Sequence, residues 1–298
     1  MGMNFNFIME PAIRWLNLRR PPSEVPLCNF ERICKEIQHC DVLLIEGRSR
    51  VSEVIKLVTQ SPWSHAALYI GRINEIEDPR LKKMLMEVYA GPHDVQLIIE
   101  SELGQGTVVR PITVYAQEHI RICRPRGLTK ADAMDVIRYA LSSLGYDYDV
   151  RQILDLARFL FPWWIMPRRW RSTLFGTNIG NITKTVCSTL IAEAFSFVQF
   201  PILPLVRKDE ENNVHFYIRN PRLTVPSLFD YSPYFDIIKY PYVDFDGGNK
   251  GYHNLPWRGI ADTELGDSAV YNYTCSSCNE NAPEQEAEGE RDIPSSLR

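Results

Sequence analysis

The sequence has no apolar run long enough to cross a membrane. Its longest apolar stretch, residues 159–166, is broken by Pro162 and falls far short of the roughly 20 residues that a spanning helix needs. The N-terminus also lacks the basic segment followed by a clean apolar stretch that marks a secretion signal. We therefore expect a cytoplasmic protein with neither a signal peptide nor a transmembrane helix.

A strong charge of one sign is missing as well. The whole chain carries −4, but residues 261–298 hold nine acidic and two basic side chains, so this segment carries −7 and residues 1–260 carry about +3. A charge of about +3 is too weak to bind the phosphate backbone of a nucleic acid, so we expect no nucleic-acid partner. The acidic segment offers little apolar surface to bury, which predicts a solvated, disordered tail.

Cysteine and histidine are few and irregularly spaced. Seven cysteines are an odd number without the spacing of a disulfide framework, which indicates a reduced protein. Cys275 and Cys278 form one Cys-x-x-Cys pair, but the sequence has no second pair at the spacing of a zinc site. The histidines also lack the spacing of metal ligands. We expect no metal and no cofactor.

Apolar residues, by contrast, are plentiful. They make up 45% of the 298 residues, enough to bury a sizeable core. Short β-rich runs dominate the first part of the chain, at 41–47, 65–71, 94–102, 106–112 and 119–125. Helical patterns occur at 29–39, 50–60, 128–145, 150–160 and 188–198, with a charged helix or long loop at 72–94. An antiparallel sheet of neighbouring strands followed by helices predicts the α+β class.

Three side chains could form a nucleophilic site. Cys187 opens a predicted helix, where free backbone N–H groups and the helix dipole favour a thiolate. His65 opens the strand 65–71, and Glu100 or Glu102, which share one strand face, could orient its imidazole. Taken one by one, these residues are more often a small buried thiol, a satisfied histidine and solvated strand-end acids.

Five motifs in order carry a family resemblance: "DVLLIEG", "SPWSHAALYIG", "LIIESELGQGTVV", "LGYDYD" and "VCSTLIAEAF". Together they resemble the circularly permuted papain-like enzymes, the YiiX/YebB-like and lipo-like relatives of NlpC-type hydrolases, in which the histidine strand precedes the cysteine helix. The sequence pattern indicates an N-terminal extension at 1–40 and a C-terminal extension with the acidic tail at 246–298, and the resemblance implies a permuted papain-like catalytic domain at 41–245.

The resemblance also implies roles. Cys187 would be the nucleophile, His65 the general base, Glu100 the residue that orients His65, and Tyr148 an aromatic hydroxyl near the nucleophile, for which core packing is an equal alternative. This implies a hydrolase or acyltransferase acting on an amide or ester of a small molecule, lipid or peptide. A cell-wall peptide amidase and a non-catalytic lipid- or partner-binding pseudoenzyme remain alternatives.

A segment rich in aromatic and basic residues raises the question of a membrane surface. Trp163 and Trp164 stand close to Arg168 and Arg169, and rings interleaved with cations suit a lipid headgroup interface. Peripheral contact with the inner face of the membrane is one expectation. The other is a linking segment whose tryptophans pack on the core while its arginines face water, and this is the more common outcome.

Overall fold

The computed structural model describes residues 14–22, 27–102, 105–144 and 187–244, together with 255, 260–261 and 270–271. The chain divides into two compact units, Met1–Val243 and Asp244–Arg298. In the second unit, strands β9 (Ile260–Ala261) and β10 (Val270–Tyr271) form an antiparallel pair. All elements described below belong to the first unit.

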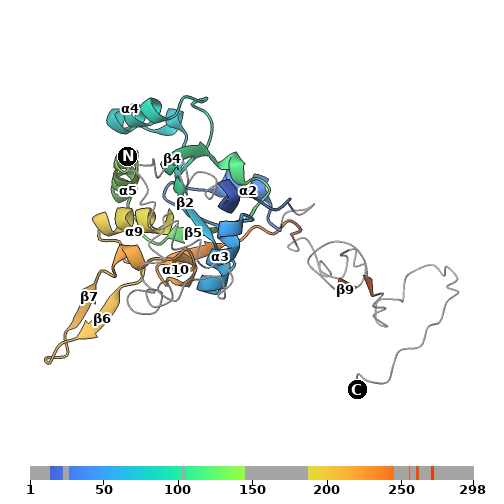
Figure 1. Ribbon diagram of the computed structural model, residues 1–298. Helices are drawn as coiled ribbons and strands as arrows, with labels where there is room; N and C mark the ends of the chain where they lie inside the picture. Colours follow the sequence, from blue (N-terminus) through green and yellow to red (C-terminus); the bar gives the residue numbers. More distant parts are fainter. Residues whose placement is uncertain are drawn as a thin grey trace, which may run out of the picture. The chain divides into compact units, whose positions relative to one another are not determined.

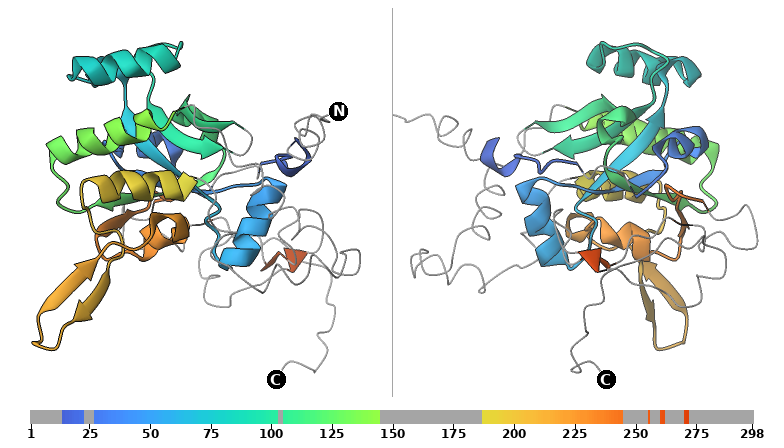
Figure 2. Two further views of the ribbon diagram at one scale, coloured as in Figure 1. Left: turned by 60° about the vertical axis from the view of Figure 1, so that its left-hand side comes forward. Right: turned by 90° about the vertical axis from the view of Figure 1, so that its right-hand side faces the viewer.

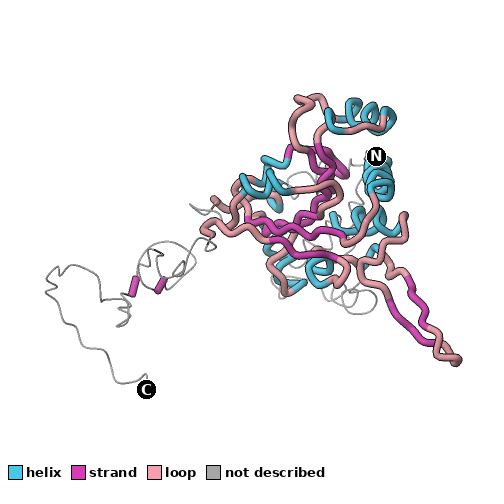
Figure 3. The backbone as a smooth tube through the Cα atoms, turned by 180° about the vertical axis from the view of Figure 1, so that it is seen from behind, coloured by secondary structure: helices cyan, strands magenta, loops and turns pink. Residues whose placement is uncertain are grey.

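A six-stranded antiparallel sheet forms the centre of this unit (Figure 3). Its strands are β1 (Val42–Glu46), β2 (His65–Gly71), β3 (Leu97–Glu102), β4 (Gly106–Pro111), β5 (His119–Pro125) and β8 (Phe235–Ile238). They lie in the order β4-β3-β2-β1-β5-β8, so neighbours in the chain are mostly neighbours in the sheet. With helices packed on it, this sheet confirms the predicted α+β class.

Both faces of the sheet are buried. In β1, Val42 and Leu44 contribute to one apolar core, and Leu43 and Ile45 to the other, because successive side chains of a strand point to opposite faces. All four are fully buried. This explains why the strand reads as a continuous apolar run instead of an alternating one.

Helices α5 (Lys130–Ser142) and α9 (Cys187–Phe197) lie side by side over the first face (Figure 2). The inner side of α5 includes Val136 and Ile137, both fully buried. Thr129 caps the N-terminus of α5 as predicted, because its side chain accepts a hydrogen bond of 3.1 Å from the backbone N–H of Asp132. Residues of the sheet, α5 and α9 belong to one buried apolar core. The packing of α9 in this core fixes the position of its first residue, Cys187.

The second face is covered by α2 (Phe30–Glu36) and the 3₁₀ turn η2 (Ile112–Tyr115). Ile33 of α2 is 1% exposed, and burying an isoleucine contributes roughly 1.5–3 kcal/mol to folding. Helix α2 falls in the segment predicted as an N-terminal extension, and its side chains pack on the sheet.

The remaining elements surround this centre. They are α3 (Arg50–Thr59), η1 (Ile73–Glu75), α4 (Pro79–Val88), β6 (Leu205–Lys208), β7 (Val214–Tyr217), η3 (Pro221–Leu223) and α10 (Ser227–Tyr231). Helix α4 forms within the charged segment 72–94, where a helix or a loop was expected. Strands β6 and β7 make a hairpin, not predicted from sequence, that projects from the sheet (Figure 1). The helix predicted at 150–160 lies outside the described residues, and within them no helix could span a bilayer.

Candidate active site

Cys187 and His65 meet where α9 begins against β2. Each is the first residue of its element. The Cys187 Sγ atom accepts a hydrogen bond of 3.3 Å from the backbone N–H of Ala66, the residue after His65. The helix start is anchored by Ser188, whose Oγ donates to the carbonyl of Thr224 at 2.7 Å. The structure thus brings together the thiol and the imidazole that the sequence separates by more than a hundred positions.

Glu100 is the carboxylate that faces His65. The Nε2 atom of His65 lies 2.7 Å from Glu100 Oε2, and the Glu100 side chain is fully buried in β3. Glu102, the rival candidate, forms an ion pair with Arg110 of β4. Because Nε2–H donates to the carboxylate, the other ring nitrogen, Nδ1, is left to interact with the Cys187 thiol.

Tyr115 completes the arrangement and was not identified from the sequence. Its hydroxyl donates to the same Oε2 atom of Glu100 at 2.5 Å, and its ring centroid lies 5.9 Å from that of His65. It stands on η2, in a stretch "ITVY" that carries no recognisable catalytic pattern. Only the pairing of β3 with β4 brings it beside Glu100, so no local signal could have identified it.

The environment shifts the pKa values of the thiol and the imidazole in opposite directions. Burial alone raises the pKa of Cys187, but the charge and hydrogen bond of His65, with the N–H groups of Ala66 and Ser188, outweigh it and leave that pKa lowered. Burial likewise lowers the pKa of His65, but Cys187 and Glu100 outweigh it and hold that pKa well above its ordinary value. Both shifts favour a thiolate paired with an imidazolium.

The environment keeps the Glu100 carboxyl ionised and the Tyr115 hydroxyl protonated. Burial raises the pKa of Glu100, but hydrogen bonds from His65 and Tyr115 outweigh it, so the pKa is lowered and the group is ionised. Burial and the charge of Glu100 raise the pKa of Tyr115 well above its usual range, so its hydroxyl keeps its proton. Glu100 is therefore an acceptor for two donors.

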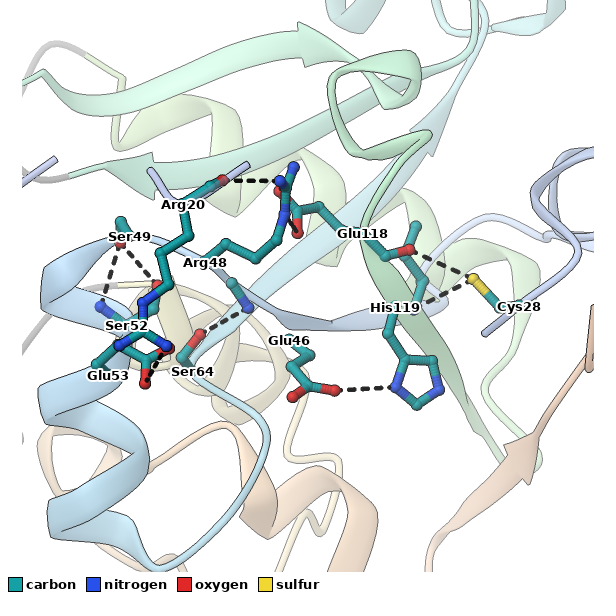
Figure 4. Close-up of polar contacts among 12 residues, drawn as sticks. Arg20, Cys28, Glu46, Arg48, Ser49, Ser52, Glu53, Ser64, Glu118 and His119 are labelled. Carbon is teal, nitrogen blue, oxygen red and sulfur yellow. Dashed lines mark hydrogen bonds and ion pairs between the residues drawn. The ribbon is translucent and has the colours of Figure 1, made fainter. Parts of the chain in front are cut away.

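A pocket of about 100 Å³ opens beside these groups. Cys187 and His65 line it, although Cys187 is only 4% exposed. The loop after β1 forms part of its wall, where the Gly47 N–H donates to Ser64 Oγ at 2.9 Å (Figure 4). A Cβ atom at Gly47 would collide with the hydroxyls of Ser52 and Ser64, so this close approach requires glycine. The reactive sulfur is thus reached from a defined pocket.

Some predicted residues lie outside the described part of the chain. Tyr148 and the membrane-contact candidates Trp163, Trp164, Arg168 and Arg169 are among them, so their roles stay predictions. Within the described ranges, no three His, Cys, Asp or Glu side chains gather in a way that could hold a metal ion.

Comparison with known proteins agrees with the motif-based resemblance. Residues 36–158 match the family described as permuted papain-like amidase enzymes, YaeF/YiiX, C92 family. The match contains His65 and Glu100 and ends before Cys187, whose assignment therefore depends on the geometry above. It confirms the predicted resemblance over these residues and supports a hydrolase.

Among the solved structures that match is the crystal structure of the metalloprotein yiiX, DUF1105, from Escherichia coli O157:H7. It shares 14% sequence identity, and the alignment covers 68% of this chain and 97% of that chain, with a TM-score of 0.40. No curated protein sequence matches this chain significantly.

Proposed function

We propose that this chain, which matches the permuted papain-like amidases over residues 36–158, is a cysteine-dependent hydrolase that cleaves an amide or ester through an acyl-enzyme on Cys187. The observation that carries the proposal is the continuous contact from Cys187 to His65 to Glu100 at the edge of a pocket. A thiolate beside an imidazolium is a strong nucleophile at neutral pH and needs no metal to act on a carbonyl.

The first half of the reaction follows from the positions of these groups. The Cys187 thiolate attacks the carbonyl carbon, and the carbonyl oxygen takes up the negative charge. Because Cys187 opens α9, backbone N–H groups of the first turn lack helical acceptors and can donate to this oxyanion. His65 then gives its Nδ1 proton to the leaving amine or alcohol, the bond to the leaving group breaks, and a thioester on Cys187 remains.

The second half reverses the proton transfer. The neutral His65 removes a proton from water, the resulting hydroxide attacks the thioester carbonyl, and the carboxylate leaves as the Cys187 thiolate is restored. Throughout, Glu100 accepts from Nε2–H, which fixes the ring orientation and stabilises the imidazolium. An amine or alcohol acceptor in place of water would make the same acyl-enzyme an acyltransferase intermediate.

Alkylation with iodoacetamide at about pH 6 tests the proposal without a known substrate. Most free thiols are protonated at this pH, and burial raises the pKa of the other described cysteines, Cys28, Cys34, Cys40 and Cys123. We expect Cys187 to be labelled first among these five, as read by mass spectrometry of peptides.

The histidine supplies the matched control. His65→Ala should slow the labelling of Cys187 at about pH 6. His119→Ala should not, although His119 also faces a carboxylate, with Nδ1 3.1 Å from Glu46 Oε2 (Figure 4). Labelling of Cys187 that follows an ordinary thiol titration and ignores His65→Ala would instead favour a binding module of the same fold.

Substrate class and acceptor are tested by a screen of wild type against Cys187→Ala. N-acyl amides, fatty-acyl esters and cell-wall muropeptides cover the proposed amide and ester classes, each with and without an added amine acceptor. Products that require Cys187 identify the bond that is cleaved. Free acid as the product supports the hydrolase, and a new amide would show a transferase.

A further inference from the structure

The charged side chains that line the active-site pocket are almost all paired. Besides the Cys187–His65 pair, the lining contains Arg19, Arg48, Glu102 and Glu118. Arg48 makes two hydrogen bonds to the carboxylate of Glu118, of 2.7 and 3.0 Å (Figure 4). Glu102 pairs with Arg110. Three of the four charges are therefore neutralised by the protein itself.

Arg19 is the exception. Its side chain is exposed, and among the described residues no carboxylate lies within ion-pair distance of it. The next residue differs, because Arg20 Nη1 lies 3.7 Å from Glu53 Oε2. The pocket therefore carries one positive charge that nothing in the described part of the chain balances.

The backbone of Arg19 is fixed although its side chain is free. Arg19 forms a β-bridge with Ser49. On one side the Arg50 N–H donates to the Leu18 carbonyl at 3.2 Å, and on the other the Arg20 N–H donates to the Arg48 carbonyl at 2.9 Å. Arg19 is thus held at the pocket by a strand-like segment attached to the start of α3, so only its side chain has to be ordered when a ligand binds.

We propose that Arg19 recognises an anionic group, a carboxylate or a phosphate, on the substrate of the proposed hydrolase. The inference depends on that function and adds the charge class of the substrate. A guanidinium matches either group with two parallel N–H bonds. The pocket also offers apolar lining from Val51 and Ile55 of α3, which suits the uncharged remainder of such a molecule.

Two alkylating reagents of nearly equal size test the charge preference. Iodoacetate is anionic and iodoacetamide is neutral, so the ratio of their rates at Cys187 reports the positive field in the pocket. Arg19→Gln should lower this ratio about two- to fivefold, as expected for one unit charge in a hydrated pocket. The contribution of His65 to the ratio is common to both proteins and cancels.

Arg20→Gln is the matched control, because Arg20 is adjacent in the chain and its charge is balanced by Glu53. It should leave the ratio unchanged. Equal ratios in wild type and Arg19→Gln would overturn the proposal, and so would an equal fall in both variants. The ratio can also be measured at about pH 9, where an unactivated thiol reacts, so failure of the hydrolase proposal and failure of this one remain distinguishable.

Protection experiments separate the two anions. Hexanoate and hexyl phosphate should slow the iodoacetamide reaction of Cys187 in wild type more than in Arg19→Gln, while neutral hexanamide should affect both proteins alike. Stronger protection by hexanoate supports a carboxylate, and stronger protection by hexyl phosphate supports a phosphate. Protection by both that is unchanged in Arg19→Gln contradicts the proposal.

Discussion

Tyr115 and His65 donate to one and the same oxygen, Oε2 of Glu100, at 2.5 and 2.7 Å. The phenol therefore stabilises the carboxylate that orients the imidazole, although it does not reach the sulfur itself. It is a positioning residue that acts through Glu100. The contribution of Tyr115 to the reactivity of Cys187 can therefore be measured with Cys187, His65 and Glu100 all in place.

Removal of this hydroxyl should change the acid side of the pH profile. In Tyr115→Phe, Glu100 loses one of the hydrogen bonds that lower its pKa, so its pKa rises and protonation begins at a higher pH. We expect the rate of Cys187 alkylation by iodoacetamide to fall off at a higher pH than in wild type. Tyr69→Phe is the control, because the Tyr69 hydroxyl is bonded to Gln96 at 3.0 Å, away from the site. Identical profiles for all three proteins would exclude the positioning role.

Glu100 and Glu102 should differ sharply in their effect on the thiol. Glu100→Gln keeps the shape but removes the charge that helps to raise the pKa of His65, so that pKa should fall, and the pKa of Cys187 should rise as its cationic neighbour is lost. We expect turnover to drop about 10²-fold, the lower range for general acid–base catalysis. Glu102→Gln removes one of the two carboxylates beside Arg110, whose Nε also lies 3.8 Å from Glu100 Oε1, and should leave both the alkylation profile and turnover nearly unchanged. A larger loss in Glu102→Gln would reassign the orienting carboxylate.

The choice between these two acids shows where sequence reasoning ends. Cys187 and His65 were predicted because the ordered motifs resemble a family in which a histidine strand precedes a cysteine helix, and the helix start adds a local reason for a thiolate at Cys187. Glu100 and Glu102 lie on one face of one strand, so no local pattern ranks them. The contacts of the folded chain rank them, because both His65 and Tyr115 of η2 bond to Glu100, whereas Glu102 pairs with Arg110 of β4.

The fold shows the same division. Strand β1 and the start of α5 were readable because an apolar run and the Thr129 cap are encoded within a few residues. The hairpin β6–β7 was missed because its strands are exposed throughout and carry no buried pattern. The attachment of Arg19 to Ser49 joins residues thirty positions apart, and neither segment indicates its partner.

Turnover should have a bell-shaped pH profile. Its acid limb should lie at a lower pH than the pKa of an ordinary thiol, and its alkaline limb at a higher pH than the pKa of an ordinary imidazole. The thiolate is needed for attack, and it forms as the pH rises through the Cys187 pKa, which is lowered from that of an ordinary thiol. The imidazolium is needed to protonate the leaving group, and it is lost as the pH rises through the His65 pKa, which is raised. A substrate identified in the screen permits the measurement of kcat/KM against pH. A single-limbed profile that rises only near the pKa of free cysteine would contradict the coupled pair.

The stability of the sheet should depend on one buried ion pair far more than on its exposed neighbour. Asp41 is fully buried immediately before β1, and Arg124 of β5 contacts both of its carboxylate oxygens, at 2.9 and 2.7 Å. Arg124→Ala would leave a buried carboxylate without its cation, which costs about 3–5 kcal/mol of unfolding free energy. Arg126→Ala breaks an ion pair in which the Arg126 side chain is 60% exposed and the Asp236 side chain 50% exposed. Exposed pairs of this kind contribute about 0–1 kcal/mol to the free energy of unfolding. Urea denaturation followed by tryptophan fluorescence measures both. Similar midpoints for the two variants would show that the Asp41–Arg124 pair does not stabilise the fold as its burial implies.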